Sequence, residues 1–330
     1  ASELLAKLLE GGHTTIAGRL AGAFRNLGRE RIADDIVATM RAASYDVRES
    51  DPFGTKRPVI PSDREQSPYV TRMRILWQVM REPVIEHFPK SPGLTKDIKG
   101  YLQHVDGVYV TDAYHSLSIE GYRVSAELIE RVRNQNWNPD NNEEDREHRN
   151  ALAARGYYQA FQVVRDSVTK VLKSKNPGTV VDDDHRSWYR ELFAPGIAAG
   201  LLQPADLAGY RNGPVYIRRS MHTPPNREAV RDLMPAFFDL LTNEPDPAVR
   251  VVLGHFMFVY IHPYMDGNGR IGRFLMNVML AAGGYPWTVI PVEERNAYMA
   301  ALEAASVGED IVPFADFLGT LVKANLDGKS

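Results

Sequence analysis

Cysteine is absent from this chain of 330 residues, which excludes disulfide bonds, cysteine-ligated zinc and a cysteine nucleophile within it. The chain has no run of eighteen apolar residues and does not open on a basic segment followed by an apolar one. We therefore expect neither a membrane-spanning helix nor a cleaved secretion signal. The formal net charge is only −3, so no overall attraction to nucleic acid or anionic lipid is expected. These absences favour a cytoplasmic globular protein with one large domain and a smaller one.

The strongest functional signal is a stretch of consecutive residues from His262 to Arg273, with the sequence HPYMDGNGRIGR. An apolar run at 249–261 precedes it and another at 274–282 follows it. Such runs predict two buried helices that hold one polar loop between them.

The loop combines small residues with two cations. Gly267, Asn268 and Gly269 adopt positive φ easily and leave room above the backbone, so their N–H groups can converge on an anion where the second helix begins. Arg270 and Arg273 fall in the first turn of that helix, where the helix dipole disfavours cations. Both arginines therefore predict a bound anion.

Two further residues of the loop carry chemistry. Asp266 offers one carboxylate, which suits Mg²⁺ that is otherwise held by phosphates and water. His262 titrates near neutrality and precedes a proline that favours an extended backbone, so it suits a general base. Each residue taken alone is more simply a helix cap, a buried histidine or a solvated arginine. That simpler interpretation does not account for all of them together.

The stretch resembles the signature of Fic (filamentation induced by cAMP) domains, H-P-F-x-D/E-G-N-G-R-x-x-R, with Tyr264 in place of phenylalanine. The resemblance implies a protein adenylyltransferase, which moves AMP from ATP onto a hydroxyl group of a target protein. It implies His262 as the base and Asp266 as the Mg²⁺ ligand. It also places Arg270 on the β-phosphate side and Arg273 at the γ-phosphate. The nucleotide-binding residues that it implies in this loop are Gly267, Asn268, Gly269, Arg270 and Arg273.

A second informative segment is Ser116–Gly121, SLSIEG. Gly121 is predicted to end a helix over about 108–121, which places Glu120 at the negative end of that helix, where a carboxylate needs a cation. An exposed glutamate before a capping glycine is the alternative. The segment also resembles the inhibitory motif of Fic proteins, S/T-x-x-x-E-G/N, with Ser116 and Glu120 at its fixed positions. We expect Glu120 to pair with Arg273, because each charge is unfavourable for its own helix dipole and favourable for the other.

Residues 211–225 depart from the helical rhythm. Asn212-Gly213-Pro214 predicts a turn, and residues 215–217 alternate weakly as a strand would. This is either a surface hairpin without function or, by resemblance, the β-hairpin flap of Fic proteins, which binds the target segment by strand addition. The flap residues would be Val215, Ile217 and Arg218.

Other residues admit two interpretations each. Asn277 is either a buried hydrogen-bonding residue or a pocket residue. Tyr298 matches a Fic position against the adenine, but a tyrosine on an amphipathic helix is also ordinary core. The acids of Asp182–His185 invite a metal assignment; we prefer an N-cap for the helix that carries Trp188.

The N-terminal part, residues 1–50, is predicted to be a small helical module with one helix that Thr14 or Thr15 caps and that runs through Leu27, and a second helix from Arg29 to Ala43. Two helices around Gly28 could form a helix-turn-helix. Its basic residues, which acidic ones interrupt, are Arg19, Arg25, Arg29 and Arg31. A solvated face is therefore favoured over a DNA-binding one. Proline and small polar residues mark 51–68 as a linker, and the Fic domain is expected over 69–325.

These observations predict a mostly all-α Fic-type bundle with one small β-hairpin flap and a helical N-terminal module. The expected reaction uses ATP and Mg²⁺ on a target protein that presents a Tyr, Ser or Thr hydroxyl, with Glu120 as an internal inhibitor. Removal of AMP and a homodimer are left open, and no membrane partner is expected. Two alternatives stay open: a Fic-type transferase of another phosphate-linked group, and a nucleotide-sensing DNA-binding regulator.

Overall fold

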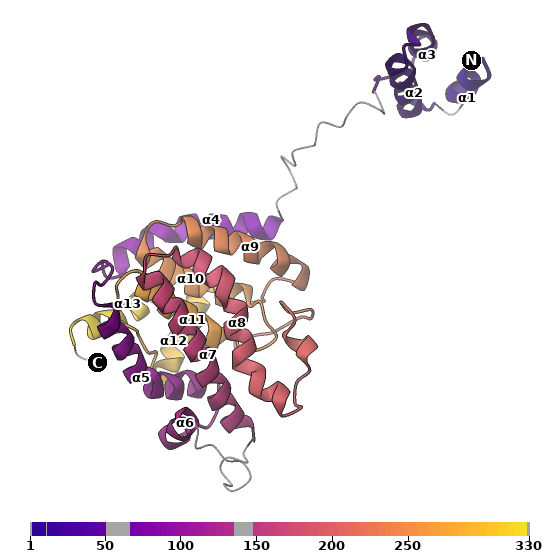
Figure 1. The fold of residues 1–330 in the computed structure, drawn as a ribbon. Coiled ribbons are helices and arrows are strands. Elements are labelled where there is room, and N and C mark those ends of the chain that lie inside the picture. The colour runs from indigo at the N-terminus through magenta and orange to yellow at the C-terminus, as the bar shows by residue number, and fades with distance from the viewer. Residues whose placement is uncertain (1, 11, 51–66, 135–147, 329–330) are drawn as a thin grey trace. The chain divides into compact units, whose positions relative to one another are not determined.

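The computed structural model describes residues 2–10, 12–50, 67–134 and 148–328. The chain divides into two compact units, Ala1–Glu65 and Gln66–Ser330 (Figure 1). The linker expected at 51–68 falls outside the described residues, apart from its last two positions. Each unit is described by itself.

The first unit contains α1 (Ser2–Glu10), α2 (Thr14–Asn26) and α3 (Glu30–Ala42). The two predicted helices are α2 and α3, whereas α1 was not predicted. Their buried core residues are Leu8, Ala17, Ala21, Ala33, Ile36, Met40 and Val47. Arg25 forms ion pairs with Asp34 at 2.7 Å and with Glu49 at 2.6 Å. These carboxylates neutralise one of the four cations that a DNA-binding face would have used.

The second unit is built from helices, and the described residues contain no strand. A mostly α-helical fold is therefore confirmed. Its helices are α4 (Pro68–His87), α5 (Ile98–Ile119), α6 (Ala126–Arg133), α7 (His148–Leu172), α8 (Pro177–Ala198), α9 (Arg227–Asn243), α10 (Pro247–Ile261), α11 (Asn268–Ala282), α12 (Arg295–Val307) and α13 (Val312–Leu326), with short 3₁₀ turns η2 (Pro204–Leu207) and η3 (Val292–Glu294). No helix of the described residues is both long enough and apolar enough to span a lipid bilayer.

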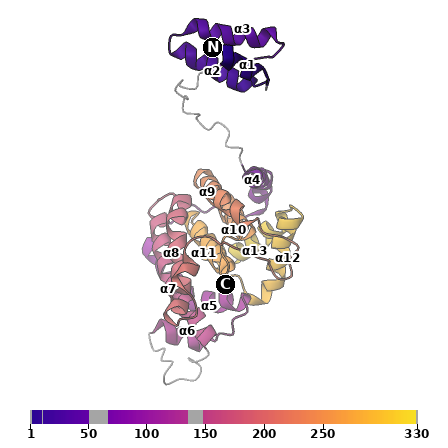
Figure 2. The same cartoon turned by 90° about the vertical axis from the view of Figure 1, so that its right-hand side faces the viewer.

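Helices α10 and α11 form the centre of this unit. They pack on each other, while α7 and α8 cover α11 and the helices α4, α9, α12 and α13 contact α10 (Figures 1 and 2). A helix that is apolar on all sides must be covered on all sides, and α10 is buried almost throughout Val249–Phe258. The predicted pair of buried helices around one loop is confirmed.

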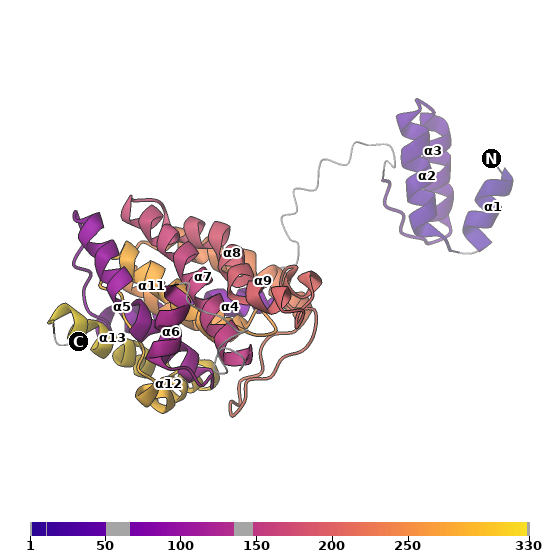
Figure 3. The ribbon, with the colours of Figure 1, turned by 60° about the horizontal axis from the view of Figure 1, so that its bottom comes forward.

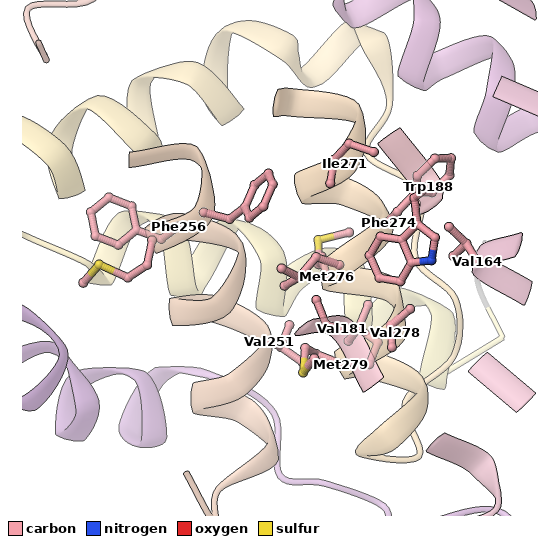
Figure 4. Close-up of a cluster of buried hydrophobic side chains, with 14 of the residues drawn as sticks. Val164, Val181, Trp188, Val251, Phe256, Ile271, Phe274, Met276, Val278 and Met279 are labelled. Carbon is pink, nitrogen blue, oxygen red and sulfur yellow. The ribbon is translucent and has the colours of Figure 1, made fainter. Parts of the chain in front are cut away.

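The core around this pair is closely packed. Figure 4 shows Phe256 of α10 and Phe274 and Met276 of α11 among side chains from the neighbouring helices, including Trp188 of α8. Phe274 is fully buried. Truncating such a phenylalanine to alanine typically costs about 3–5 kcal/mol. The loop between α10 and α11 therefore connects two helices whose side chains are buried along most of their length.

The β-hairpin expected at 211–225 is not formed. The segment runs as a long loop without a strand (Figure 3). Pro214, Pro224 and Pro225 supply no backbone donors for a ladder. The Arg211 side chain, rather than a partner strand, binds the carbonyl groups at both limbs of the loop, at Gly213 and Pro225.

The N-cap expected at Asp182–His185 is wrong, because α8 begins earlier. Asn176 is its N-cap, accepting a hydrogen bond from the Thr179 N–H at 3.1 Å. Asparagine followed directly by proline is a strong start signal for a helix, and it places Asp182–His185 in the helix interior. Within the described residues, no group of three or more His, Asp or Glu side chains could hold a metal ion.

Candidate active site

The turn after α10 starts with His262, whose backbone is left-handed, at φ 53° and ψ 60°. The expected extended backbone before Pro263 is therefore not observed. The residue that ends a helix often adopts this left-handed conformation. At His262 this preference is stronger than the preference for an extended backbone before a proline. The His262 carbonyl is held by the Arg211 Nε at 2.8 Å.

The rest of the turn is held by Asn268. Its side-chain oxygen accepts from the Tyr264 N–H at 2.9 Å, and its amide donates to the Tyr264 carbonyl at 2.8 Å. Asn268 is buried. The Tyr264 ring stacks on Tyr189 with centroids 3.7 Å apart and planes 6° apart. The turn is therefore fixed by contacts on both of its sides.

His262 is arranged to accept a proton. Its Nδ1 lies 3.2 Å from the Val259 carbonyl oxygen, and because a carbonyl can only accept, Nδ1 carries the hydrogen and Nε2 a lone pair. Burial lowers the pKa of His262 below its ordinary 6.5. The ring is therefore neutral at pH 7, with Nε2 ready to act as a base.

Arg273 forms the predicted contact with Glu120. Its NH2 lies 2.7 Å from the Glu120 Oε1, while its Nε donates to the Ser116 Oγ at 2.8 Å and its NH2 to the Ser116 carbonyl at 3.0 Å. The Arg273 side chain is only 4% exposed and that of Glu120 is 26% exposed. Two residues one helical turn apart on α5 thus hold one buried arginine of α11.

The charges of this pair support each other. Burial raises the pKa of Glu120, but the attraction of Arg273 and Arg270 outweighs it and leaves the Glu120 pKa below its ordinary value. Burial lowers the pKa of Arg273, and Glu120 more than offsets this, so the Arg273 pKa is raised. Glu120 and Arg273 are consequently both charged at neutral pH.

Gly269 explains how Glu120 comes so close. A Cβ at this position would lie 2.2 Å from the Glu120 Oε1 and 3.1 Å from the Arg273 NH1. Only a glycine lets the carboxylate of α5 approach the first turn of α11 at this distance. Gly267 precedes that turn with φ +84°, again a conformation that favours glycine.

Arg270 is the second buried cation, with its side chain 2% exposed. Its guanidinium carbon lies 5.2 Å from the Tyr122 ring and 5.1 Å from the Phe193 ring, so it sits between two aromatic faces. Its NH2 is 3.2 Å from the Asp266 Oδ2, within ion-pair range but outside hydrogen-bond geometry. Three buried nitrogens have no hydrogen-bond partner among the described residues: Arg270 Nε and NH2, and Arg273 NH1.

The sequence did not identify Asp112, which lies on α5 on the same side as Ser116 and Glu120. Its carboxylate accepts from the Tyr157 hydroxyl at 2.6 Å and the Trp287 indole at 3.2 Å. Burial raises the pKa of Asp112 to about 6. A carboxylate on the buried face of a predicted helix was the signal that could have revealed it.

Asn277 and Tyr298 lie in the core. The Asn277 side chain accepts from the Thr288 N–H at 2.8 Å and donates to the Thr288 carbonyl at 3.1 Å, which corresponds to the buried hydrogen-bonding alternative. The Tyr298 side chain is buried, and its hydroxyl lies 2.7 Å from the His255 Nε2. A role of Tyr298 against an adenine stays a prediction.

The three expected flap residues differ in their exposure. Val215 and Ile217 are half-buried, and Arg218 is exposed. A cavity of about 450 Å³ is lined by Val215 together with Tyr69 and residues 223–228. None of the residues 262–273 lines that cavity.

Fold and site together define a helical protein with two buried arginines near the start of a central helix, beside a neutral histidine. Residues 183–280 match the Fic/DOC family. The chain is 29% identical to Protein adenylyltransferase Fic from Drosophila willistoni and 30% identical to that from Nematostella vectensis, in each case over 69% of this chain. It spans 41% and 48%, respectively, of the length of these two relatives. The part of the chain that matches the Fic/DOC family, residues 183–280, includes the whole loop from His262 to Arg273.

Solved structures agree with this fold. Fic-1 from C. elegans superposes with a TM-score of 0.56 at 20% identity, covering 98% of this chain and 91% of that one. A signaling protein containing a Fic domain from Bacteroides thetaiotaomicron gives a TM-score of 0.51 at 18% identity, covering 78% of this chain and 94% of that one.

Proposed function

We propose that this protein transfers AMP from ATP to a Tyr, Ser or Thr hydroxyl of a target protein, and that Glu120 restrains the reaction. One observation supports this proposal above all. Buried guanidinium nitrogens of Arg270 and Arg273 have no hydrogen-bond partner among the described residues, at the same loop that holds a neutral His262. Buried donors without partners are costly, so an anionic ligand is expected there. The curated relatives named adenylyltransferases support ATP as that ligand.

The start of α11 suits the phosphates. Ile271 is the residue whose N–H bonds back to the Gly267 carbonyl, at 3.0 Å. The N–H groups of residues 268–270, which precede it in the first turn, are therefore directed out of the helix start. With the dipole and the two arginines they form an anion site. In the proposed complex Arg270 contacts the β-phosphate and Arg273 the γ-phosphate.

The chemistry needs one base. The target hydroxyl oxygen attacks the α-phosphorus while the His262 Nε2 takes the hydroxyl proton. The bond from the α-phosphorus to the bridging oxygen breaks, and pyrophosphate leaves with that oxygen. Positioning and charge neutralisation supply most of the rate enhancement in such transfers.

Asp266 fits the Mg²⁺ that ATP brings with it. Its side chain is 62% exposed, and no cluster of three ligands surrounds it among the described residues. A single carboxylate suits Mg²⁺, which keeps several waters and binds substrate phosphates. When bound, the ion neutralises charge on the phosphates. Asp266 also accepts a 2.6 Å hydrogen bond from the Gly267 N–H, which keeps its carboxylate at the loop.

In this proposal Glu120 restrains the enzyme by occupying Arg273. The carboxylate stands where the γ-phosphate charge would bind, so ATP either displaces it or binds with its phosphates out of line for attack. One charge-assisted hydrogen bond contributes about 1.5–3 kcal/mol. Removing the competitor is therefore expected to raise activity about 10- to 100-fold.

The test is label transfer from ATP carrying the label on the α-phosphate. We expect Glu120→Gly to label itself and lysate proteins about 10- to 100-fold faster than the unchanged protein. Glu120→Gln, which removes the charge but keeps the shape, is the matched variant and should also gain activity. His262→Ala in the Glu120→Gly background is the inactive control, with ATP binding retained because the imidazole holds no phosphate.

The outcomes separate the parts of the proposal. Transfer of a label from the γ-phosphate instead of the α-phosphate would replace AMP transfer by phosphate transfer. A folded Glu120→Gly protein that binds ATP but labels no faster than the unchanged protein would remove the inhibitory role and leave the transferase in place. Transfer that persists in the His262→Ala variant would contradict the role of His262 as the base.

A further inference from the structure

Arg211 is a buried cation with an unusual set of partners. Only 4% of the residue is exposed, and no carboxylate among the described residues pairs with it. Its Nε donates to the His262 carbonyl at 2.8 Å and its NH1 to the Gly213 carbonyl at 3.1 Å. Its NH2 donates to the Pro225 carbonyl and lies 3.5 Å from the Ile261 carbonyl. Backbone carbonyl groups thus surround the buried guanidinium and take the place of water.

These carbonyl groups belong to two different segments of the chain. Ile261 and His262 end α10, and carbonyl groups there form the negative end of a helix, which favours a cation. Gly213 and Pro225 lie at the two limbs of the loop that leaves and rejoins the bundle between η2 and α9. The Arg211 N–H also donates to the Pro263 carbonyl at 2.8 Å. One residue therefore ties the neck of this loop to the turn that carries His262.

We propose that Arg211 is a positioning residue, which fixes the left-handed backbone of His262 and the neck of the 213–225 loop in one geometry. The inference rests on the proposed function, in which the His262 ring takes a proton from the hydroxyl of a target protein. The end of α10 favours a left-handed backbone at His262, but the Cβ of a histidine makes that backbone unfavourable, so a contact from outside the helix helps to keep it. The guanidinium supplies that contact at the carbonyl of His262 itself.

Lysine is not an adequate substitute at this position. Arginine offers five donors in a planar fork, which can reach carbonyls in several directions at once. An ammonium group carries the same charge but only three donors around one point. Arg211→Lys therefore keeps the charge and loses the geometry, whereas Arg211→Met loses both. The two variants separate positioning from electrostatics.

The charge has a separate, measurable effect on His262. Burial is the largest influence and lowers the pKa of His262; the Arg211 charge and His222 lower it further, while Val259 and Glu120 raise it. Removing the Arg211 charge should therefore raise the pKa of His262. Since the base must be neutral, the acid limb of the pH–rate profile should move to higher pH in Arg211→Met and stay in place in Arg211→Lys.

The experiment measures transfer in the Glu120→Gly background, with KM for ATP and kcat determined separately. We expect Arg211→Lys to lower kcat roughly 10- to 100-fold, because a small displacement of a reacting group has an effect of this size, and to change KM for ATP less than about threefold. The matched control is Arg227→Lys. Arg227 donates to the Asn212 carbonyl at 2.9 Å, at the same neck, but it does not contact His262, so its replacement should leave kcat unchanged.

A second readout does not depend on activity. The His262 ring is titrated by NMR in the full chain, with His262→Ala used to assign its signals. We expect Arg211→Lys to shift the ring resonances without moving the pKa, Arg211→Met to raise the pKa, and Arg227→Lys to change neither. If the Glu120→Gly protein transfers no AMP, the proposed function fails while this titration still tests the positioning. A folded Arg211→Lys protein with unchanged ring resonances and unchanged kcat would overturn the positioning role of Arg211.

Discussion

The two segments that border His262 are held in place by different means. The turn from His262 to Gly267 is short, lies between two buried helices, and is closed by the side chain of Asn268, which follows it directly. The loop at 212–226 is long, and two side chains outside it bind it. Arg211, which directly precedes the loop, binds its two ends, and Glu303 of α12 binds it near its middle. Glu303 accepts from the Ser220 hydroxyl and, at 2.7 Å, from the Met221 N–H.

This difference indicates how each segment tolerates change. In the turn, one side chain, Asn268, bonds both backbone groups of the buried Tyr264, so its loss leaves two buried groups unpaired. The loop exposes 82% of both Tyr216 and Met221, and water can replace a lost contact there. We therefore expect sharp effects in the turn and graded effects in the loop.

The largest expected effect comes from Asn268→Ala. It leaves the Tyr264 N–H and carbonyl unpaired in a buried site, at a cost of about 1–3 kcal/mol for each group, so both the melting temperature and AMP transfer should fall. The control is Asn277→Ala, which also loses hydrogen bonds to buried backbone groups, at Thr288 and at the Arg273 carbonyl, but bonds no residue of the turn from His262 to Gly267. Calorimetry should show similar destabilisation of both, and only Asn268→Ala should lose transfer at a temperature where both are folded. Equal transfer in both would contradict the role of Asn268 in the site.

A smaller effect is expected from Glu303→Ala. It releases the loop at Ser220 and Met221, where the lost hydrogen bonds contribute about 0.5–1.5 kcal/mol each. We expect the KM for the target protein to rise several-fold while the KM for ATP does not change. The control is Glu294→Ala, because Glu294 is an exposed glutamate directly before α12, the helix that carries Glu303. An unchanged KM for the target would show that the position of this loop does not matter for the target protein.

The smallest effect is expected from Tyr264→Phe, and it is stabilising. The Tyr264 hydroxyl is buried without a partner among the described residues, so removing it should add about 1 kcal/mol of stability, or roughly 2–4 °C in melting temperature for a domain of this size. Tyr298→Phe is the contrast, because its hydroxyl bonds His255 and its loss should lower the melting temperature. A decrease in both variants would mean that the Tyr264 hydroxyl has a partner.

The difference between the turn and the loop also explains which features could be predicted from the sequence. In the turn, Asn268 bonds Tyr264, only four residues before it, so local spacing was enough to place the loop, while the anion site stays a prediction. The pairing of Glu120 with Arg273 was also predictable, since each charge conflicts with its own helix.

Contacts between distant residues that carry no such conflict of charge were not predictable. Arg211 lies 51 residues before His262, and Ser220 lies 83 before Glu303, so no local pattern shows that they meet. The hairpin was therefore predicted from alternation that the structure does not use. The prediction of an extended backbone at His262 was wrong for another reason. Pro263 favours an extended backbone before it, but the end of α10 favours a left-handed one.

Glu120 is part of the same chain as the arginine it binds, and in the proposed mechanism this makes it a tethered competitor of ATP. A tethered ligand has an effective concentration set by its linkage rather than by the solution. The linkage is stiff, because Asp112, about two helical turns earlier on α5, is bonded to Tyr157 and Trp287. Diluting the protein should therefore leave the fraction of Arg273 bound to Glu120 unchanged, and only movement of α5 or a tighter-binding phosphate should reduce it.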